Sequence, residues 1–383
     1  MTPFPASEFA ARTARAQAGM AAAGLSALLL TTEPEIRYYT GFLTRFWESP
    51  SRPWFVVVPA EGPPIAVIPA IGAHLMGQSW IRDIRTFAAP APDESALALL
   101  ALTLREEVPP GGLIGLPDGA ETHVRLPFSD WAVLQDLTLR RRFVGDGGLV
   151  ARLRQAKSAA EIDRIATACA IAGRAFARVP EIAGAGVPLD QVFRGFQGLC
   201  LGEGADWVAY LAGGAGPGGY GDVISPATAR PLAPGDVLML DTGVVHGGYY
   251  SDFDRNFSVG PPGAEVAEAH ETLIAASRAA KAIAHPGTTH AELFHAMHSL
   301  TSGGTPGANT GRIGHGLGME LTEGPSLLPW ETASLRPGMV ITLEPVIELS
   351  PGRIMVHEEV IAIEEDGARW LSNPAPPQIA VLS

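Results

Sequence analysis

The sequence predicts an α/β protein of two domains that meet near residue 150. First, its 383 residues exceed the size at which one hydrophobic core usually stops growing. Second, the N-terminal part mixes helical spacing over residues 7–24 and 93–107 with short apolar runs at 25–31, 54–59 and 64–69. Third, a longer helical pattern begins at Arg154. We therefore expect domains at 1–150 and 151–383.

The second domain begins with two predicted helices. Lys157 and Ser158 stand near the start of the first, and the second covers about residues 188–202. The following stretch, 213–221, is dominated by glycine. It lacks the Lys-Ser/Thr of a phosphate-binding loop, so we expect a flexible loop beside a site.

Charge and composition exclude several classes of protein. The formal net charge of −13 does not favour nucleic-acid binding. Cys169 and Cys200 are too few for a disulfide framework, which fits the cytoplasm. Residues 1–20 lack the apolar core of a signal peptide, and no run reaches the roughly 18 apolar residues of a membrane span. We expect no nucleic-acid or membrane partner.

Two acidic residues occur in a predicted β-hairpin made of residues 237–245 and 248–259. The intervening His246-Gly247 suits a two-residue turn that pairs Val245 with Gly248. This register places Asp241 directly opposite Asp252 on one face of the hairpin.

A second hairpin, 339–349 with 353–363, repeats the arrangement. Its turn is expected at residues 350–352, with Leu349 opposite Arg353. Glu344 then faces Glu358, unless a bulge forms beside Pro345.

Opposed carboxylates in apolar strands require compensation. A single acid in such a strand is more often structural than a ligand, but two independent pairs favour divalent cations. Between the hairpins, His315 is flanked by Gly314 and Gly316, which allow close approach. Four carboxylates and one imidazole suit two ions of Mn, Fe, Co or Zn better than Mg or Ca.

These motifs resemble the M24 (pita-bread) metallopeptidase family of creatinase, aminopeptidase P and prolidase. The matching segments are LDTG, GGYYSDFDRNF, GHGLG, TLEP, VHEEVIAIEEDG and, at 154–162, RQAKSAAEI. The weaker RYYTGFLTRFWE at 37–48 is similar to the creatinase-type N-terminal domain. The resemblance implies such a domain followed by a pita-bread catalytic domain with a pseudo-twofold antiparallel sheet.

The resemblance also implies how the residues divide the work. Asp241 would bind one ion, Asp252 and Glu358 would bridge both, and His315 with Glu344 would bind the other. A metal-bridging hydroxide would cleave an amide or peptide bond, with Glu344 moving its proton. Both ions are expected to be manganese, with zinc, cobalt and iron as alternatives.

Three departures from the family pattern concern the substrate side. Thr322 stands where the family has the histidine of an HE pair, and a second expected histidine falls near Ile224, beside Asp222. Asp254 replaces the usual threonine. We therefore expect an atypical proline peptidase, better suited to a small polar amide.

Two further clusters have plainer interpretations. Around Arg45, Trp47 and Arg52, core packing of the rings competes with substrate capture across a homodimer, as in creatinase-like enzymes. The four histidines at 285, 290, 295 and 298 are expected on a solvated helix face.

Two classes of function stay open. The first is a hydrolase resembling Xaa-Pro aminopeptidase or dipeptidase, acting on a short peptide or small molecule. The alternative is a non-peptidase of the same fold, such as an amidinohydrolase or a dimethylsulfoniopropionate-type lyase; a binding protein that only retains the fold is a weaker interpretation.

Overall fold

The computed structural model describes residues 4–47, 53–90, 95–119, 121–302 and 311–383. The chain divides into two compact units, Met1–Arg154 and Gln155–Ser383. None of the helices in the described residues is long and apolar enough to cross a membrane.

The first unit is built around one six-stranded mixed sheet, ordered β4-β3-β2-β1-β5-β6. Its apolar side chains pack against α4 and α5 to form a core that includes Leu29, Val57 and Leu100. Its elements are α1 (Ala6–Ala23), β1 (Ala27–Leu30), α2 (Glu33–Thr40), β2 (Phe55–Pro59), β3 (Ile65–Pro69), α3 (Ala73–Met76), β4 (Asp83–Phe87), α4 (Ser95–Glu107), β5 (Leu113–Leu116), α5 (Phe128–Leu137), β6 (Arg142–Gly145) and α6 (Leu149–Gln155).

The second unit repeats one pattern, two helices followed by antiparallel strands. Its first half contains α7 (Ala159–Ala177), α8 (Leu189–Gly202), β7 (Trp207–Pro217), β8 (Asp236–His246), β9 (Tyr249–Tyr250) and β10 (Phe253–Val259). Its second half contains α9 (Ala264–Ile283), α10 (His290–Thr301), β11 (His315–Gly316), β12 (Glu323–Ser326), β13 (Val340–Leu343), β14 (Val346–Ser350), β15 (Arg353–Val356), β16 (Glu359–Glu364), β17 (Gly367–Trp370) and β18 (Ala380–Leu382).

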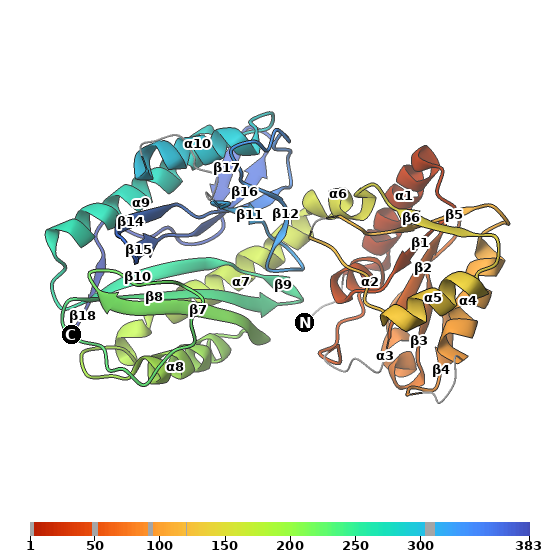
Figure 1. Cartoon of the computed structure of the whole chain (residues 1–383), viewed down its shortest axis with the longest axis horizontal. Coiled ribbons are helices and arrows are strands. Elements are labelled where there is room, and N and C mark those ends of the chain that lie inside the picture. Colours follow the sequence, from red (N-terminus) through yellow and green to blue (C-terminus); the bar gives the residue numbers. More distant parts are fainter. Residues whose placement is uncertain (1–3, 48–52, 91–94, 120, 303–310) are drawn as a thin grey trace. The chain divides into compact units, whose positions relative to one another are not determined.

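The two halves of this unit form layers with the sheets inside. One sheet has the order β18-β10-β8-β7 with β9 beside β8, another the order β12-β11-β13-β16-β17, and β14 pairs with β15. In Figure 1, α7 and α8 cover the first sheet, whereas α9 and α10 cover the strands of the second half. The apolar faces of the helices and sheets close two cores, one around Phe294 and Ile361 and one around Met239 and Leu273.

Local sequence signals explain where the helices of this unit begin. Ser158 caps α7 by accepting the N–H of Glu161, whose side chain returns a bond to the Ser158 backbone. Thr289 and Glu292 form the same reciprocal arrangement at the start of α10. Both helices therefore start at a sequence of the form S/T-x-x-E.

The glycine-rich stretch expected as a loop is partly a strand. Residues 213–217 pair with β8 from Leu240 to Asp236 as the end of β7. A Cβ on Gly213 would lie 2.1 Å from the Met239 carbonyl oxygen, so the close strand pairing itself requires glycine. The glycines mark backbone approach rather than a flexible loop.

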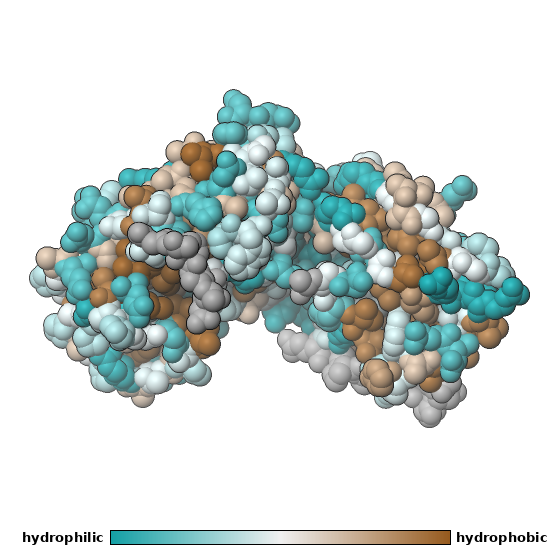
Figure 2. Space-filling model, turned by 45° about the horizontal axis from the view of Figure 1, so that its top comes forward, coloured by the Kyte–Doolittle hydropathy of each residue, from teal (hydrophilic) through white to brown (hydrophobic). Residues whose placement is uncertain are grey.

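The surface of the protein mixes side chains of both kinds. Figure 2 shows hydrophobic residues scattered among hydrophilic ones on the face that it draws. The most exposed large hydrophobic residues include Phe128, Ile224 and Trp330, which come from separate parts of the chain. Single exposed hydrophobic residues of this kind are normal for a folded protein.

Candidate metal centre

The first predicted hairpin forms, but with a different register. His246 pairs with Tyr249, and the turn residues are Gly247 and Gly248, at φ 64° and 80°. A two-residue turn of this kind needs positive φ at both positions, which two glycines adopt at little cost and a histidine does not. The predicted turn at His246-Gly247 is wrong.

This shift changes which acids face each other. Asp241 is opposite Asp254, not opposite Asp252 as predicted. Asp252 lies two residues earlier in the short gap between β9 and β10. It is still close enough for the charge of Asp241 to raise its pKa, after burial as the larger cause.

The second hairpin keeps its predicted register. Leu343 pairs with Glu359, and Val346 pairs with Val356, so Glu344 and Glu358 lie between these pairs in a break of the ladder. The predicted pairing of Leu349 with Arg353 is wrong, because an irregularity between Glu348 and Ser350 brings Ser350 opposite Arg353.

A group of three buried ligand-type side chains forms where the halves of this unit meet. One ligand atom from each of Asp252, His315 and Glu358 lies within 4.8 Å of the others. The His315 Nε2 is 3.4 Å from the Asp252 Oδ2. The Nδ1 of His315 is 2.9 Å from the Gly316 carbonyl oxygen. A carbonyl can only accept, so Nδ1 carries the proton and Nε2 has a lone pair for a cation.

Electrostatics add Asp241 and Glu344 to this group. Burial raises the pKa of Asp241 well above its ordinary value, and the charges of Asp254 and Glu344 raise it further. Burial, followed by Asp254, raises the pKa of Glu344 to about 7. Burial lowers the pKa of His315 to about 4, which keeps the imidazole neutral. Burial also raises the pKa of Glu358 well above normal, with Asp252 as the next cause.

The donor set fits divalent cations. Among the described residues, the buried Asp241 Oδ1 and Glu358 Oε1 have no hydrogen-bond partner. Buried carboxylate oxygens without partners are costly in a protein that binds no cation there. Four carboxylates and a neutral imidazole are the ligands that manganese, iron, cobalt and zinc accept. These five side chains therefore suit the binding of divalent cations.

Two side chains near this group were not anticipated from the sequence. Tyr210 on β7 hydrogen-bonds Asp241, and burial, followed by the charges of the acids around it, raises its pKa. Arg312 is exposed, and its positive charge lowers the pKa of Asp252, Glu344 and His315. A cation three residues before the histidine of GHG is a signal that could have indicated Arg312. No pattern in the sequence marks Tyr210.

The predicted substrate-side residues have mixed environments. Thr322 is half-buried, and its Oγ1 accepts from Arg312 Nη2 at 3.2 Å. Asp222 is exposed, and its carboxylate accepts from the N–H of Ile224 and from the N–H and hydroxyl of Ser225. This local turn occupies both oxygens of Asp222. Asp254 is fully buried, its Oδ1 contacts His357 and the N–H of Glu358, and its Oδ2 has no hydrogen-bond partner among the described residues. Its contact with a substrate stays a prediction.

Trp47, from the aromatic-basic cluster of the first unit, is buried against another tryptophan. Its ring is 8% exposed and lies 5.7 Å from that of Trp54, and its carbonyl accepts from Arg125. The structure therefore places Trp47 in a packed core, and substrate capture by this side chain across a homodimer stays a prediction. Arg45 is exposed, and Arg52 lies outside the described residues.

The histidine-rich stretch is not a uniformly solvated face. His290 and His298 are buried, the first against the Ala333 carbonyl and the second stacked on Phe294, whereas His285 and His295 are exposed. Helix α10 packs on α9 and contributes Phe294 to the core around Phe294 and Ile361, which explains why these two histidines are buried.

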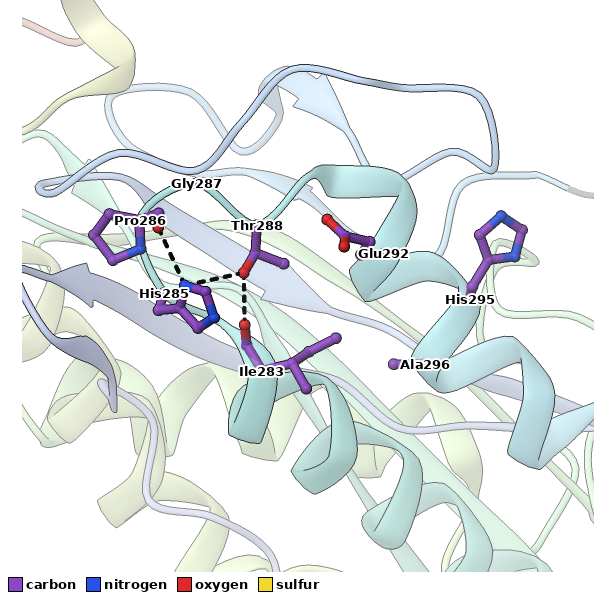
Figure 3. Close-up of a pocket in the computed structure, with 8 residues that line it drawn as sticks. All are labelled: Ile283, His285, Pro286, Gly287, Thr288, Glu292, His295 and Ala296. Carbon is purple, nitrogen blue, oxygen red and sulfur yellow. Dashed lines mark hydrogen bonds between the residues drawn. The ribbon is translucent and has the colours of Figure 1, made fainter.

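A surface pocket of about 550 Å³ lies between the end of α9 and the start of α10. Figure 3 shows that His285 turns toward Pro286 and Thr288, away from His295. These two histidines do not converge on a common point, so the pocket is not a second metal cluster.

Comparisons with known proteins agree with this architecture. The family model described as Metallopeptidase family M24 matches residues 163–368, and the model described as Creatinase/Prolidase N-terminal domain matches residues 12–155. The probable dipeptidase PepE of Mycobacterium tuberculosis is 31% identical over 387 residues, which cover 99% of this chain and 98% of that protein. An Xaa-Pro dipeptidase of Pyrococcus furiosus is 31% identical over 148 residues, which cover 38% of this chain and 42% of that protein.

Solved structures give the same result for the fold. Dipeptidase PepE from Mycobacterium ulcerans superposes with a TM-score of 0.84 at 29% identity, covering 100% of both chains. A prolidase from Thermococcus sibiricus superposes with a TM-score of 0.85 at 23% identity, covering 98% of this chain and 99% of that one. At that identity, the second likeness shows the fold alone.

Layered halves with buried carboxylates and a neutral histidine between them define a metal-dependent hydrolase of the pita-bread fold. The chain belongs to metallopeptidase family M24. The predicted family, fold class and kind of enzyme are therefore confirmed.

Proposed function

We propose that this chain is a dipeptidase whose two divalent ions are held by five side chains in the unit assigned to residues 151–383. The supporting observation is the buried group of Asp252, His315 and Glu358, whose ligand atoms lie within 4.8 Å of one another. The proposed ligands are Asp241, Asp252, His315, Glu344 and Glu358. Residues 1–150 are proposed to be the creatinase-type N-terminal domain.

The ions, when bound, supply the charge that acidifies a water and polarises the scissile carbonyl. The protein side chains orient these charges. Asp241 is assigned to one ion, Asp252 and Glu358 to both, and His315 with Glu344 to the other. Glu344 is the most exposed of the four carboxylates, so it is the proposed carrier of the proton to the leaving nitrogen.

Arg312 is proposed to bind the carboxylate of a dipeptide. It is exposed beside the metal centre, and Thr322 and Ser326 accept hydrogen bonds from its two terminal nitrogens. The positive charge of an exposed guanidinium beside these acids suits a short substrate with a free C-terminal carboxylate.

A non-peptidase activity is the second candidate, and two positions favour it. Ile224 is 83% exposed and offers no donor, and Thr322 stands where a histidine is expected. A peptidase that lacks donors to the oxyanion loses about 2.7–4 kcal/mol of transition-state stabilisation for each. A compact polar amide or amidine with an easier leaving group would depend less on them.

The finer assignments follow from chemistry. Manganese is proposed as the resident ion because carboxylates dominate the ligand set, with zinc, cobalt or iron as alternatives. Cys169 and Cys200 are both free and buried, which supports a reducing cytoplasm. A homodimer is proposed from the family resemblance.

The test combines metal analysis with a substrate panel. Chelated protein is reconstituted with Mn²⁺, Co²⁺ or Zn²⁺, and bound metal is counted. Dipeptides with and without proline, their C-terminal amides, and small amides and amidines are then compared by kcat/KM. More than one ion per chain and faster turnover of dipeptides than of their amides would support the proposal. A folded protein that binds no metal would refute it.

A further inference from the structure

The carboxylate of Asp254 accepts a hydrogen bond from the backbone of Glu358, one of the proposed metal ligands. Its Oδ1 accepts the backbone N–H of Glu358 at 3.0 Å and lies 3.1 Å from the Nδ1 of His357. The side chain is 0% exposed. These contacts join β10 of the first half to the segment between β15 and β16 of the second.

The break in the second hairpin explains why this bond matters. The β13–β16 ladder stops at Leu343 and Glu359, and the β14–β15 ladder starts at Val346 and Val356. Asp254 supplies the acceptor for the N–H of Glu358 within this break. Asn256, on the same face of β10, donates to the Val356 carbonyl at 2.6 Å. Side chains of β10 thus take the place of a neighbouring strand.

His357 balances the charge that Asp254 brings. Its Nδ1 faces Asp254, and its Nε2 is 3.2 Å from the Glu359 Oε1. Glu359 is held in turn by the N–H of Ala375 at 2.7 Å and by Arg255 at 3.2 Å. The two ring nitrogens of His357 therefore tie the Asp254 carboxylate to that of Glu359.

We propose that Asp254 and His357 are a positioning pair that fixes Glu358 relative to Asp252. Asp252 and Asp254 are separated by one residue, so a bond from Asp254 to the Glu358 backbone sets the spacing of the two carboxylates assigned to both ions. This inference rests on the proposed metal centre. It assigns the pair no contact with the substrate.

Cobalt reports this geometry directly, because its visible absorption depends on ligand number and arrangement. The variants are Asp254→Thr, the nearly isosteric Asp254→Asn, His357→Val, and Asp254→Thr with His357→Val. Circular dichroism of the metal-free proteins checks that each is folded. We expect Asp254→Thr to weaken Co²⁺ binding by about 10- to 100-fold and to change the spectrum. The two single changes should be non-additive, since each removes the partner of the other.

Asn256→Ser is the matched control. It removes a buried hydrogen bond from the same face of β10 to the Val356 carbonyl at the end of β15, two residues before the proposed ligand Glu358. It should lower thermal stability and leave the cobalt affinity within about twofold of wild type. A spectral change equal to that of Asp254→Thr would mean general loosening and would overturn the inference.

Two further outcomes separate this inference from the function on which it rests. Wild-type protein that binds cobalt, together with Asp254 variants that are folded and bind it identically, would refute the positioning pair alone. Wild-type protein that is folded and binds no cobalt would refute the metal centre as well.

Discussion

Chelating the metal should make the stability of this protein fall steeply as pH rises from 6.5 to 8. Burial and mutual repulsion raise the pKa of Asp241, Asp252 and Glu358 well above normal, and that of Glu344 to about 7. A carboxyl whose pKa is raised on folding keeps a proton that the unfolded chain has lost above about pH 4. The unfolding free energy then declines with pH until the folded pKa is passed.

Two histidines of lowered pKa act in the opposite direction, and only below this window, whereas the raised pKa of His357, which has Asp254 and Glu359 as partners, acts in the same direction as the carboxyls. The pKa of His315 and that of His270 are each lowered to about 4 by burial, so the unfolded chain binds more protons there between about pH 4 and 6.5. Above pH 6.5 these imidazoles are neutral in both states, and the carboxyls dominate. Each retained proton contributes about 1.4 kcal/mol per pH unit. Each carboxyl that keeps its proton across this window therefore lowers the unfolding free energy by about 2 kcal/mol between pH 6.5 and 8.

Urea unfolding of chelated and metal-loaded protein at several pH values measures this difference. The metal-loaded protein should show a much shallower slope, because cations replace the protons, and loading should release protons into weakly buffered solution. Asp241→Asn should flatten the slope of the chelated protein. As a matched control, Asp236→Asn changes a buried acid that is paired with Arg230 and should leave the slope in place. Equal slopes with and without metal would refute the reasoning.

Three other predictions concern single side chains. Asp252→Asn should leave less than one ion per chain by elemental analysis and lower kcat/KM by more than about 100-fold. Thr242→Ser should keep the metal content and kcat/KM of the wild type. Full turnover by the Asp252 variant would mean that the metal centre lies elsewhere. Arg312→Ala should raise KM for dipeptides by about 10-fold or more and change little for their C-terminal amides, with Arg336→Ala as control; equal effects on both substrates would exclude carboxylate binding. Lys157→Met should cost about 3–5 kcal/mol in urea unfolding, because it removes the cation that the buried Glu323 carboxylate contacts at 2.9 Å. Arg174→Met, in an exposed ion pair, should cost less than about 1 kcal/mol. Similar costs for the two variants would contradict the burial argument.

The sequence predicted the second hairpin better than the first for a physical reason. Proline and glycine at 351 and 352 restrict the second turn so strongly that the flanking register follows. The structure departs from the prediction at a small bulge at Leu349 and at the break of the ladder beside Glu344 and Glu358. In the first hairpin, three turn formers at 246–248 allow two registers that alternation of side chains does not distinguish, since a shift by two residues keeps the same face. The acids were therefore placed on the correct face but beside the wrong neighbours.

Other features depend on tertiary contacts that local patterns do not contain. The strand made by residues 213–217 requires β8 as a partner, and the burial of His290 requires the loop that carries Ala333. Asp254 was recognised as a departure from the family, but its bond to the Glu358 backbone joins segments 104 residues apart. Each proposed metal ligand, in contrast, lies in a short sequence motif, so the similarity of these motifs to those of the M24 family is visible in the sequence alone.

The proposed ligands are divided between the two halves of the second unit, with Asp241 and Asp252 in one and His315, Glu344 and Glu358 in the other. A bound ion would therefore be a covalent-like cross-link that closes a loop of about 100 residues, comparable in its effect on the unfolded chain to a disulfide of the same span. Amide hydrogen exchange in both sheets should then slow together when metal is added, including in strands far from any ligand. In this protein the catalytic ions would also determine how cooperatively the unit unfolds.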